Sequence, residues 1–113
     1  MKPNILIIDD EIDFCYLLKS YFEKRQCSFI MSHSLEEGIS LCREIQPHIL
    51  FLDNNLPDGN GWDNVERIVE IVPQIRMYLV SAHREAISFE KKWSNMDVWE
   101  KPISFKQLED ILL

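Results

Sequence analysis

The chain has 113 residues, 46% of them hydrophobic, and this length and composition predict one compact domain with one core. Its formal net charge of −7 at pH 7 argues against sequence-independent binding to nucleic acid or to an anionic membrane, because both require a positive surface. The three cysteines contain no CxxC pair, so we expect reduced, mostly buried thiols rather than a disulfide framework or a zinc site. No apolar run is long enough for a signal peptide or a membrane span, so we expect a cytoplasmic protein.

Short apolar runs rich in Ile, Leu and Val alternate with longer segments of helical period, which indicates repeated strand and helix units. Five strands are predicted, at Ile5–Ile8, Ser28–Met31, Ile49–Leu52, Ile75–Val80 and Met96–Trp99. The first and third runs are apolar at every position, as expected of central parallel strands covered on both faces. The second and fifth runs contain polar residues, which favours places at the sheet edges.

The segments between these strands show apolar faces at helical spacing. These faces are Cys15, Leu18 and Phe22; Leu35, Ile39 and Cys42; Val65, Ile68, Val69 and Val72; and Phe105, Leu108 and Ile111 in a final helix that runs to Leu113. A fourth helix is predicted over about Arg84 to Trp93. Ser34 and Glu37 have the spacing of a capping box for the second helix, and Pro47 and Pro73 end the second and third helices.

Polar side chains stand where four of the predicted strands end. The first strand ends in Asp9 and Asp10, the third in Asp53 and the fourth in Ser81, while the fifth leads into Lys101. Right-handed crossovers place the carboxyl ends of parallel strands at one edge of the sheet, where ligands bind. Clustered carboxylates repel one another, and Mg²⁺ prefers oxygen ligands of this kind. The sequence therefore predicts a magnesium site at this edge.

Each of these residues also has a purely structural interpretation. Asp10 has the residue type of a helix N-cap, and Asp53 has the residue type that begins a turn. Ser81 could satisfy a loop amide, and Lys101 is an ordinary surface residue type. Their coincidence at matching strand ends favours a shared functional site.

Four stretches at these ends resemble the signature of the response-regulator receiver domain of two-component signalling. They are IIDDE at 7–11, LDNNLPDGNG at 52–61, LVSAH at 79–83 and EKP at 100–102. In the second stretch Pro57 lies four residues after Asp53, and Gly61 lies eight after it. The resemblance covers nearly the whole chain and implies the α/β flavodoxin-like (βα)5 fold, a doubly wound parallel sheet of strand order 2-1-3-4-5. It makes residues 1–113 a single receiver domain, either a stand-alone protein or a part of a longer regulator.

The resemblance also implies a role for each acidic residue. Asp53 matches the acceptor of a phosphoryl group from a histidine kinase or a histidine phosphotransfer protein. Asp10 matches a direct Mg²⁺ ligand, Asp9 a ligand acting through water, and the backbone carbonyl of Asn55 completes the protein ligands together with Asp53. The function implied is phospho-acceptance with Mg²⁺ as cofactor, followed by switching of a protein-interaction surface.

The remaining matched residues concern the phosphoryl group and the switch. Ser81 matches the switch hydroxyl, Lys101 matches the phosphoryl partner, and the bond from Lys101 to Pro102 is expected to be cis. Val98 departs from the family, because receivers usually carry Tyr or Phe three residues before the lysine. Phospho-acceptance is expected to survive this change, while the mode of output is open.

Two positions are expected to tune the lifetime of an aspartyl phosphate. They are His83, two residues after Ser81, and Asn55, two residues after Asp53. For His83 a solvated loop residue and a catalytic residue are both open, and the first is favoured. His33 and His48 are expected to be plain surface or strand-start residues. Trp93 and Trp99 either pack in the core or form an apolar patch for a partner.

The expected partners are the phosphodonor and a downstream protein or output domain, without direct nucleic-acid or membrane contact. A homodimer through the fourth helix, fifth strand and fifth helix is a further option. Catalysis is limited to self-catalysed phosphotransfer and autodephosphorylation. Two alternatives stay open. A phosphohydrolase typically needs a second Asp where Asn55 stands, and a pseudo-receiver docking module would predict loss of acidic residues that are all present.

Overall fold

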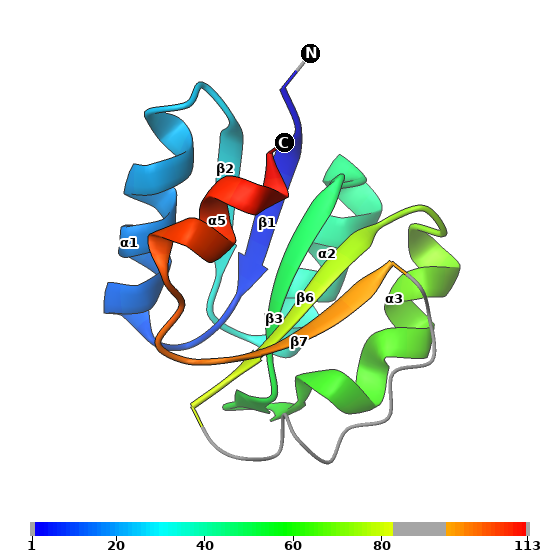
Figure 1. The fold of residues 1–113 in the computed structure, drawn as a ribbon. Helices are drawn as coiled ribbons and strands as arrows, with labels where there is room; N and C mark the ends of the chain where they lie inside the picture. Colours follow the sequence, from blue (N-terminus) through cyan, green and yellow to red (C-terminus); the bar gives the residue numbers. More distant parts are fainter. Residues whose placement is uncertain (1, 83–94, 113) are drawn as a thin grey trace.

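The computed structural model describes residues 2–82 and 95–112 and contains a five-stranded parallel sheet (Figure 1). Its strands are β1 (Asn4–Ile8), β2 (Ser28–Ser32), β3 (Ile49–Asp53), β6 (Arg76–Ser81) and β7 (Met96–Glu100). They lie in the order β2-β1-β3-β6-β7, so the second and fifth runs are the edge strands. The predicted flavodoxin-like fold with strand order 2-1-3-4-5 is confirmed.

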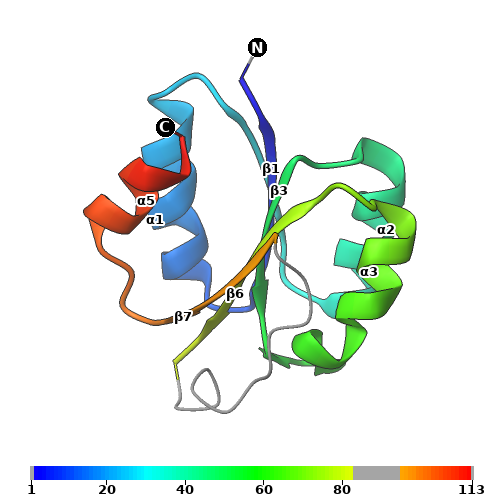
Figure 2. The ribbon, with the colours of Figure 1, turned by 45° about the vertical axis from the view of Figure 1, so that its right-hand side comes forward.

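Helices cover both faces of this sheet. Figure 2 shows α1 (Ile12–Glu23) and α5 (Phe105–Ile111) on one face, and α2 (Leu35–Ile45) and α3 (Val65–Ile71) on the other. The predicted fourth helix, over about Arg84 to Trp93, lies outside the described residues, and so does His83. Within the described ranges, every helix is too short or too polar to cross a bilayer.

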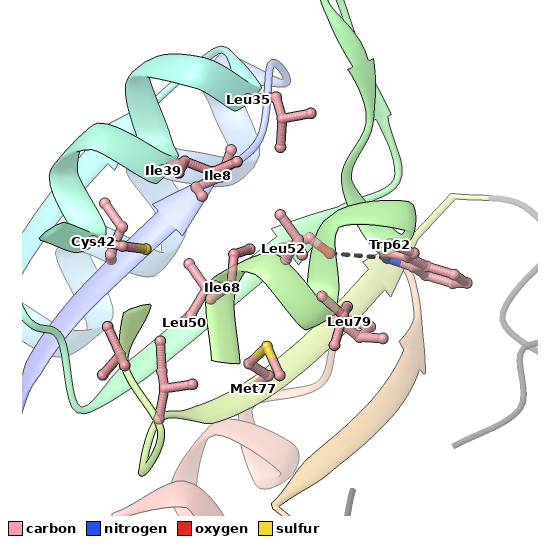
Figure 3. Close-up of a cluster of buried hydrophobic side chains, with 14 of the residues drawn as sticks. Ile8, Leu35, Ile39, Cys42, Leu50, Leu52, Trp62, Ile68, Met77 and Leu79 are labelled. Carbon is pink, nitrogen blue, oxygen red and sulfur yellow. Dashed lines mark hydrogen bonds between the residues drawn. The ribbon is translucent and has the colours of Figure 1, made fainter. Parts of the chain in front are cut away.

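The core has two layers because side chains of a strand alternate between its faces. In β3, Leu50 and Leu52 pack towards α2 and α3, whereas Ile49 and Phe51 pack towards α1 and α5. Figure 3 shows the first of these layers. All five residues of β3 are buried, as the uninterrupted apolar run predicted.

Aromatic rings continue the second layer across the sheet. Phe51 stacks on Tyr78 with ring centroids 5.3 Å apart, and Tyr78 contacts Trp99 at 4.6 Å. Trp99 is only partly buried but packs against this layer. Trp99 therefore packs on the core as one interpretation predicted, while part of its side chain stays exposed. Cys15, Cys27 and Cys42 are buried free thiols, also as predicted.

The predicted capping box of the second helix is wrong. Ser34 occupies the N-cap of α2, but its side chain makes no capping hydrogen bond. Instead, the Asp58 carboxylate accepts from the backbone N–H groups of Leu35 at 2.7 Å and Glu36 at 3.0 Å. One carboxylate thus accepts from two backbone donors at once, and its negative charge is stabilising at a helix N-terminus.

The capping box of the described chain is on α5, where Ser104 and Gln107 bond reciprocally. Phe105, predicted to be part of the buried face of this helix, is 60% exposed. The first turn of α5 lies beside α1, and Phe105 stacks on Tyr21 there with ring centroids 5.7 Å apart. Leu108 and Ile111 alone form the buried face.

Candidate functional site

The carboxyl ends of four neighbouring strands bring the predicted polar residues to one edge of the sheet. Asp9 and Asp10 follow β1, Asp53 is the last residue of β3, Ser81 is the last of β6, and Lys101 follows β7. Carboxylate oxygens of Asp9, Asp10 and Asp53 all lie within 4.8 Å of one another. We call these three residues the acidic cluster. Asp9 and Asp53 are buried, and Asp10 is exposed.

The loop after Asp53 is fixed by contacts that leave no room for larger residues. A Cβ atom at Gly61 would overlap the backbone carbonyl oxygen of Asp53. The Gly61 N–H donates to the Asn54 carbonyl at 2.9 Å, and the Trp62 N–H donates to the Asn54 side chain at 3.2 Å. The Trp62 indole N–H also donates to the Leu52 carbonyl at 3.1 Å (Figure 3). These bonds hold the end of β3, and Asp53 with it, in one position.

Between Asp53 and Gly61 the chain forms a short hairpin that the sequence did not predict. Its strands are β4 (Asn55–Leu56) and β5 (Gly59–Asn60), paired antiparallel. Gly59 has φ +153°, a conformation that side chains disfavour. The 3₁₀ helix η1 (Gly61–Asn64) follows and leads into α3, so the third helical segment begins at Gly61.

The Lys101 ammonium enters the acidic cluster from the side of β7. It lies 2.8 Å from Asp9 Oδ2 and 2.9 Å from Glu11 Oε1. It also lies 4.4 Å from the centre of the Phe14 ring. The side chain is 11% exposed, so this charge is shielded from water on most sides. The bond from Lys101 to Pro102 is cis, as the family resemblance implied.

Burial and mutual repulsion set the protonation of the carboxylates. Burial, reinforced by the negative charges of Asp9 and Asp10, raises the pKa of Asp53 to about 7 against the opposing pull of Lys101. Burial also raises the pKa of Asp9, although the Lys101 ammonium and the Glu11 N–H favour its charged form. For Lys101, burial is outweighed by bonds to Asp9 and Glu11, which raise its pKa. The cluster holds more negative charge than one lysine balances.

This donor set fits a small hard cation. Three carboxylates supply oxygen atoms at one place, and burial beside two other carboxylates disfavours the charged form of Asp53 and raises its pKa. A divalent cation beside these oxygens would relieve that repulsion. The acidic cluster can therefore bind a metal ion.

Ser81 and Val98 lie on the two strands beyond β3. Asp53 pairs with Val80 in the β3–β6 register, which places Ser81 one residue beyond that pair. Ser81 is buried, and its carbonyl accepts from the Lys101 N–H at 2.8 Å. Val98 is partly buried and packs against the layer of α2 and α3. The family resemblance implied an aromatic ring at this position, and Val98 has a smaller side chain.

The interpretation of Asp10 as the N-cap of the first helix is wrong. The N-cap of α1 is Glu11, whose side chain makes no capping bond. Asp9 Oδ1 accepts from the Glu11 N–H at 2.9 Å, so the local turn is closed by the preceding carboxylate. The exposed Asp10 side chain stays available to the acidic cluster.

Sequence reasoning missed three residues around the cluster. Glu11 is the second partner of Lys101. It is the last residue of the IIDDE motif, but the motif does not indicate a contact with Lys101. His33, expected to be a plain surface residue, is half-buried with its Nδ1 atom 3.0 Å from the Asp9 carbonyl oxygen. The Cys15 thiol donates to the same oxygen at 3.3 Å. His33 gives no sequence signal for this contact, whereas Cys15 lies on the predicted buried face of its helix.

Three carboxylates and a lysine thus gather at the carboxyl edge of a parallel sheet. The family model of the response regulator receiver domain matches residues 5–113, so the chain belongs to this family. It is 23% identical over 112 residues to sporulation initiation phosphotransferase F of Bacillus subtilis (strain 168). This match covers 97% of this chain and 90% of that protein.

Other relatives are longer than this chain. The chain is 31% identical over 84 residues to the transcriptional regulatory protein CitB of Klebsiella pneumoniae, covering 73% of this chain and 36% of that protein. Among solved structures, a response regulator protein from Burkholderia pseudomallei matches with a TM-score of 0.84 and 20% identity. The match covers 100% of this chain and 67% of that one, whose structure contains a phosphorylated aspartic acid, a calcium ion and citrate.

Proposed function

We propose that Asp53 accepts a phosphoryl group from the phosphohistidine of a histidine kinase or a histidine phosphotransfer protein in the cytoplasm. The observation that carries this proposal is the position of Asp53, a buried carboxylate 5% exposed within the acidic cluster. Membership of the receiver family and the phosphorylated aspartic acid of the Burkholderia pseudomallei protein support it.

Mg²⁺ is the cofactor of this proposal. Asp10 and Asp53 would bind it directly, with the backbone carbonyl of Asn55, and Asp9 would bind it through water. When bound, Mg²⁺ neutralises charge that develops on the phosphoryl oxygens during transfer. The calcium ion in the Burkholderia pseudomallei structure supports a divalent cation, and the preference of Mg²⁺ for carboxylates, water and phosphate supports this metal.

The chemical step needs an anionic nucleophile and no general base. An Asp53 carboxylate oxygen forms a bond to phosphorus as the bond from phosphorus to the donor imidazole nitrogen breaks, and the donor keeps that electron pair. The Lys101 ammonium pairs with one phosphoryl oxygen, and the Ser81 hydroxyl donates to another. Asp9 and Glu11 already hold the Lys101 ammonium at this edge of the sheet.

The output of the proposed switch depends on β6 and β7. A phosphoryl group adds a charge of about −1.5 to −2 next to Ser81, and this charge biases the position of the strand ends. Val98 has no aromatic ring that could change rotamer when the strand ends move. The surface beside β7 would therefore change through the packing of its side chains. The downstream partner is a protein or an output domain, and a homodimer through this face is an alternative arrangement.

Incubation with Mg²⁺ and acetyl phosphate tests the proposal. We expect a covalent adduct of one phosphoryl group that is absent from the Asp53→Asn variant. Continuous release of inorganic phosphate without a lasting adduct would identify a phosphohydrolase instead. No adduct with acetyl phosphate and no response to beryllofluoride would identify a docking module that works without phosphorylation.

A further inference from the structure

The backbone of Asp9 is held by more hydrogen bonds than the sheet supplies. Its N–H donates to the Ser32 carbonyl at 3.0 Å. Its carbonyl oxygen lies 3.0 Å from His33 Nδ1 and accepts from the Cys15 thiol at 3.3 Å. Asp9 is fully buried, so a carbonyl at this strand end needs protein donors. Two side chains from separate elements meet that need.

The chemistry of both donors is fixed by their partner. A carbonyl oxygen can only accept, so His33 Nδ1 carries the hydrogen in this contact. The thiol of Cys15 keeps its proton because burial raises its pKa to about 12. Cys15 reaches the oxygen from α1, and His33 reaches it from the segment between β2 and α2. The Asp9 carbonyl is therefore held from two directions.

The side chain of Asp9 is held as well. Its Oδ1 atom accepts from the Glu11 N–H at 2.9 Å, and its Oδ2 atom pairs with the Lys101 ammonium at 2.8 Å. The carbonyl that Cys15 and His33 hold belongs to the peptide unit that leads into Asp10. The orientation of this unit sets the direction in which the Asp10 side chain leaves the backbone.

We propose that His33 and Cys15 are positioning residues that hold the peptide between Asp9 and Asp10 so that both carboxylates face Asp53. This inference rests on the proposed function, because it assigns the two residues to the affinity of the acidic cluster for Mg²⁺. Mutation of residues that orient metal ligands typically lowers metal affinity by about 10- to 100-fold. A role limited to filling space or satisfying a buried carbonyl would affect stability alone.

The test is a Mg²⁺ titration of the folded protein, in which amide chemical shifts report binding. Cys15→Ala and His33→Leu remove the donors, whereas Cys15→Ser and His33→Asn keep a donor group near the same place. His48→Leu is the matched control, because the His48 Nδ1 atom also bonds to the backbone, accepting from the Asn4 N–H at 2.9 Å, at the opposite edge of the sheet. Urea unfolding of each variant measures stability separately.

We expect the dissociation constant for Mg²⁺ to rise about tenfold when both donors are removed. It should rise less in His33→Leu alone, return towards the wild-type value in His33→Asn and Cys15→Ser, and stay unchanged in His48→Leu. Folded donor-loss variants that bind Mg²⁺ as tightly as the wild type would overturn the inference while leaving the proposed function intact. A wild-type protein that binds no Mg²⁺ and takes no phosphoryl group would instead overturn the proposed function.

Discussion

Replacing Asp53 by Asn should change how the stability of the metal-free protein depends on pH. Burial and the neighbouring carboxylates raise the pKa of Asp53 from 3.8 to about 7. The folded protein then holds this proton more tightly than the unfolded chain, so the free energy of unfolding falls as the pH rises from about 4 to about 7. The difference between the two values corresponds to at most about 4 kcal/mol. About 2.7 kcal/mol of this falls between about pH 5 and about pH 8. We expect about 2 kcal/mol in that window, because structural relaxation and water entry reduce such penalties.

Urea unfolding in the presence of EDTA, at about pH 5 and about pH 8, measures this effect. The wild type should lose about 2 kcal/mol more between these two conditions than Asp53→Asn does. Asp110→Asn serves as the control, because it removes an exposed carboxylate of α5 outside the acidic cluster. Excess Mg²⁺ should reduce the difference by stabilising the Asp53 carboxylate. Equal pH dependence in wild type and Asp53→Asn would refute this account of the cluster's electrostatics.

Three further predictions concern residues around the cluster. Lys101→Met should destabilise the fold by about 3 kcal/mol, because it leaves the buried Asp9 carboxylate without its counter-charge. The same variant should lose phosphoryl uptake from acetyl phosphate, and uptake at the wild-type rate would contradict the role of Lys101. Trp62→Phe should cost about 1 kcal/mol in urea unfolding, because the Leu52 carbonyl loses its indole donor; an unchanged midpoint would contradict this. Asp58→Ala should lower the urea midpoint, because it removes the cap of α2, whereas Ser34→Ala should leave the midpoint unchanged. A larger loss in Ser34→Ala than in Asp58→Ala would contradict the assignment of Asp58 as the cap of α2.

Much of the fold is predictable because its signals are local. The uninterrupted apolar run at Ile49–Leu52 marks a central strand, and the polar residue types in the second run mark an edge. Once the strands are assigned, the crossover rule alone places Asp9, Asp53 and Lys101 at one edge. The structure brings the carboxylates of Asp9, Asp10 and Asp53 together there.

The errors come from contacts between segments distant in sequence. Asp58 caps α2 across 22 or 23 residues, and His33 reaches Asp9 across 24, so neither pairing has a sequence pattern. Ser34 has the correct spacing for a capping box, but a carboxylate from another loop takes its place. Phe105 fits the helical period of α5, but the period does not indicate that this turn lies beside α1 rather than over the sheet.

Locating the phosphoryl group gives the most direct test of phospho-acceptance at the acidic cluster. The protein is treated with acetyl phosphate and Mg²⁺, the acyl phosphate is reduced with borohydride, and peptides are sequenced by mass spectrometry. We predict homoserine at position 53 and no modification in Asp53→Asn. Modification at a different residue, or undiminished uptake by Asp53→Asn, would contradict the assignment of Asp53 as the acceptor.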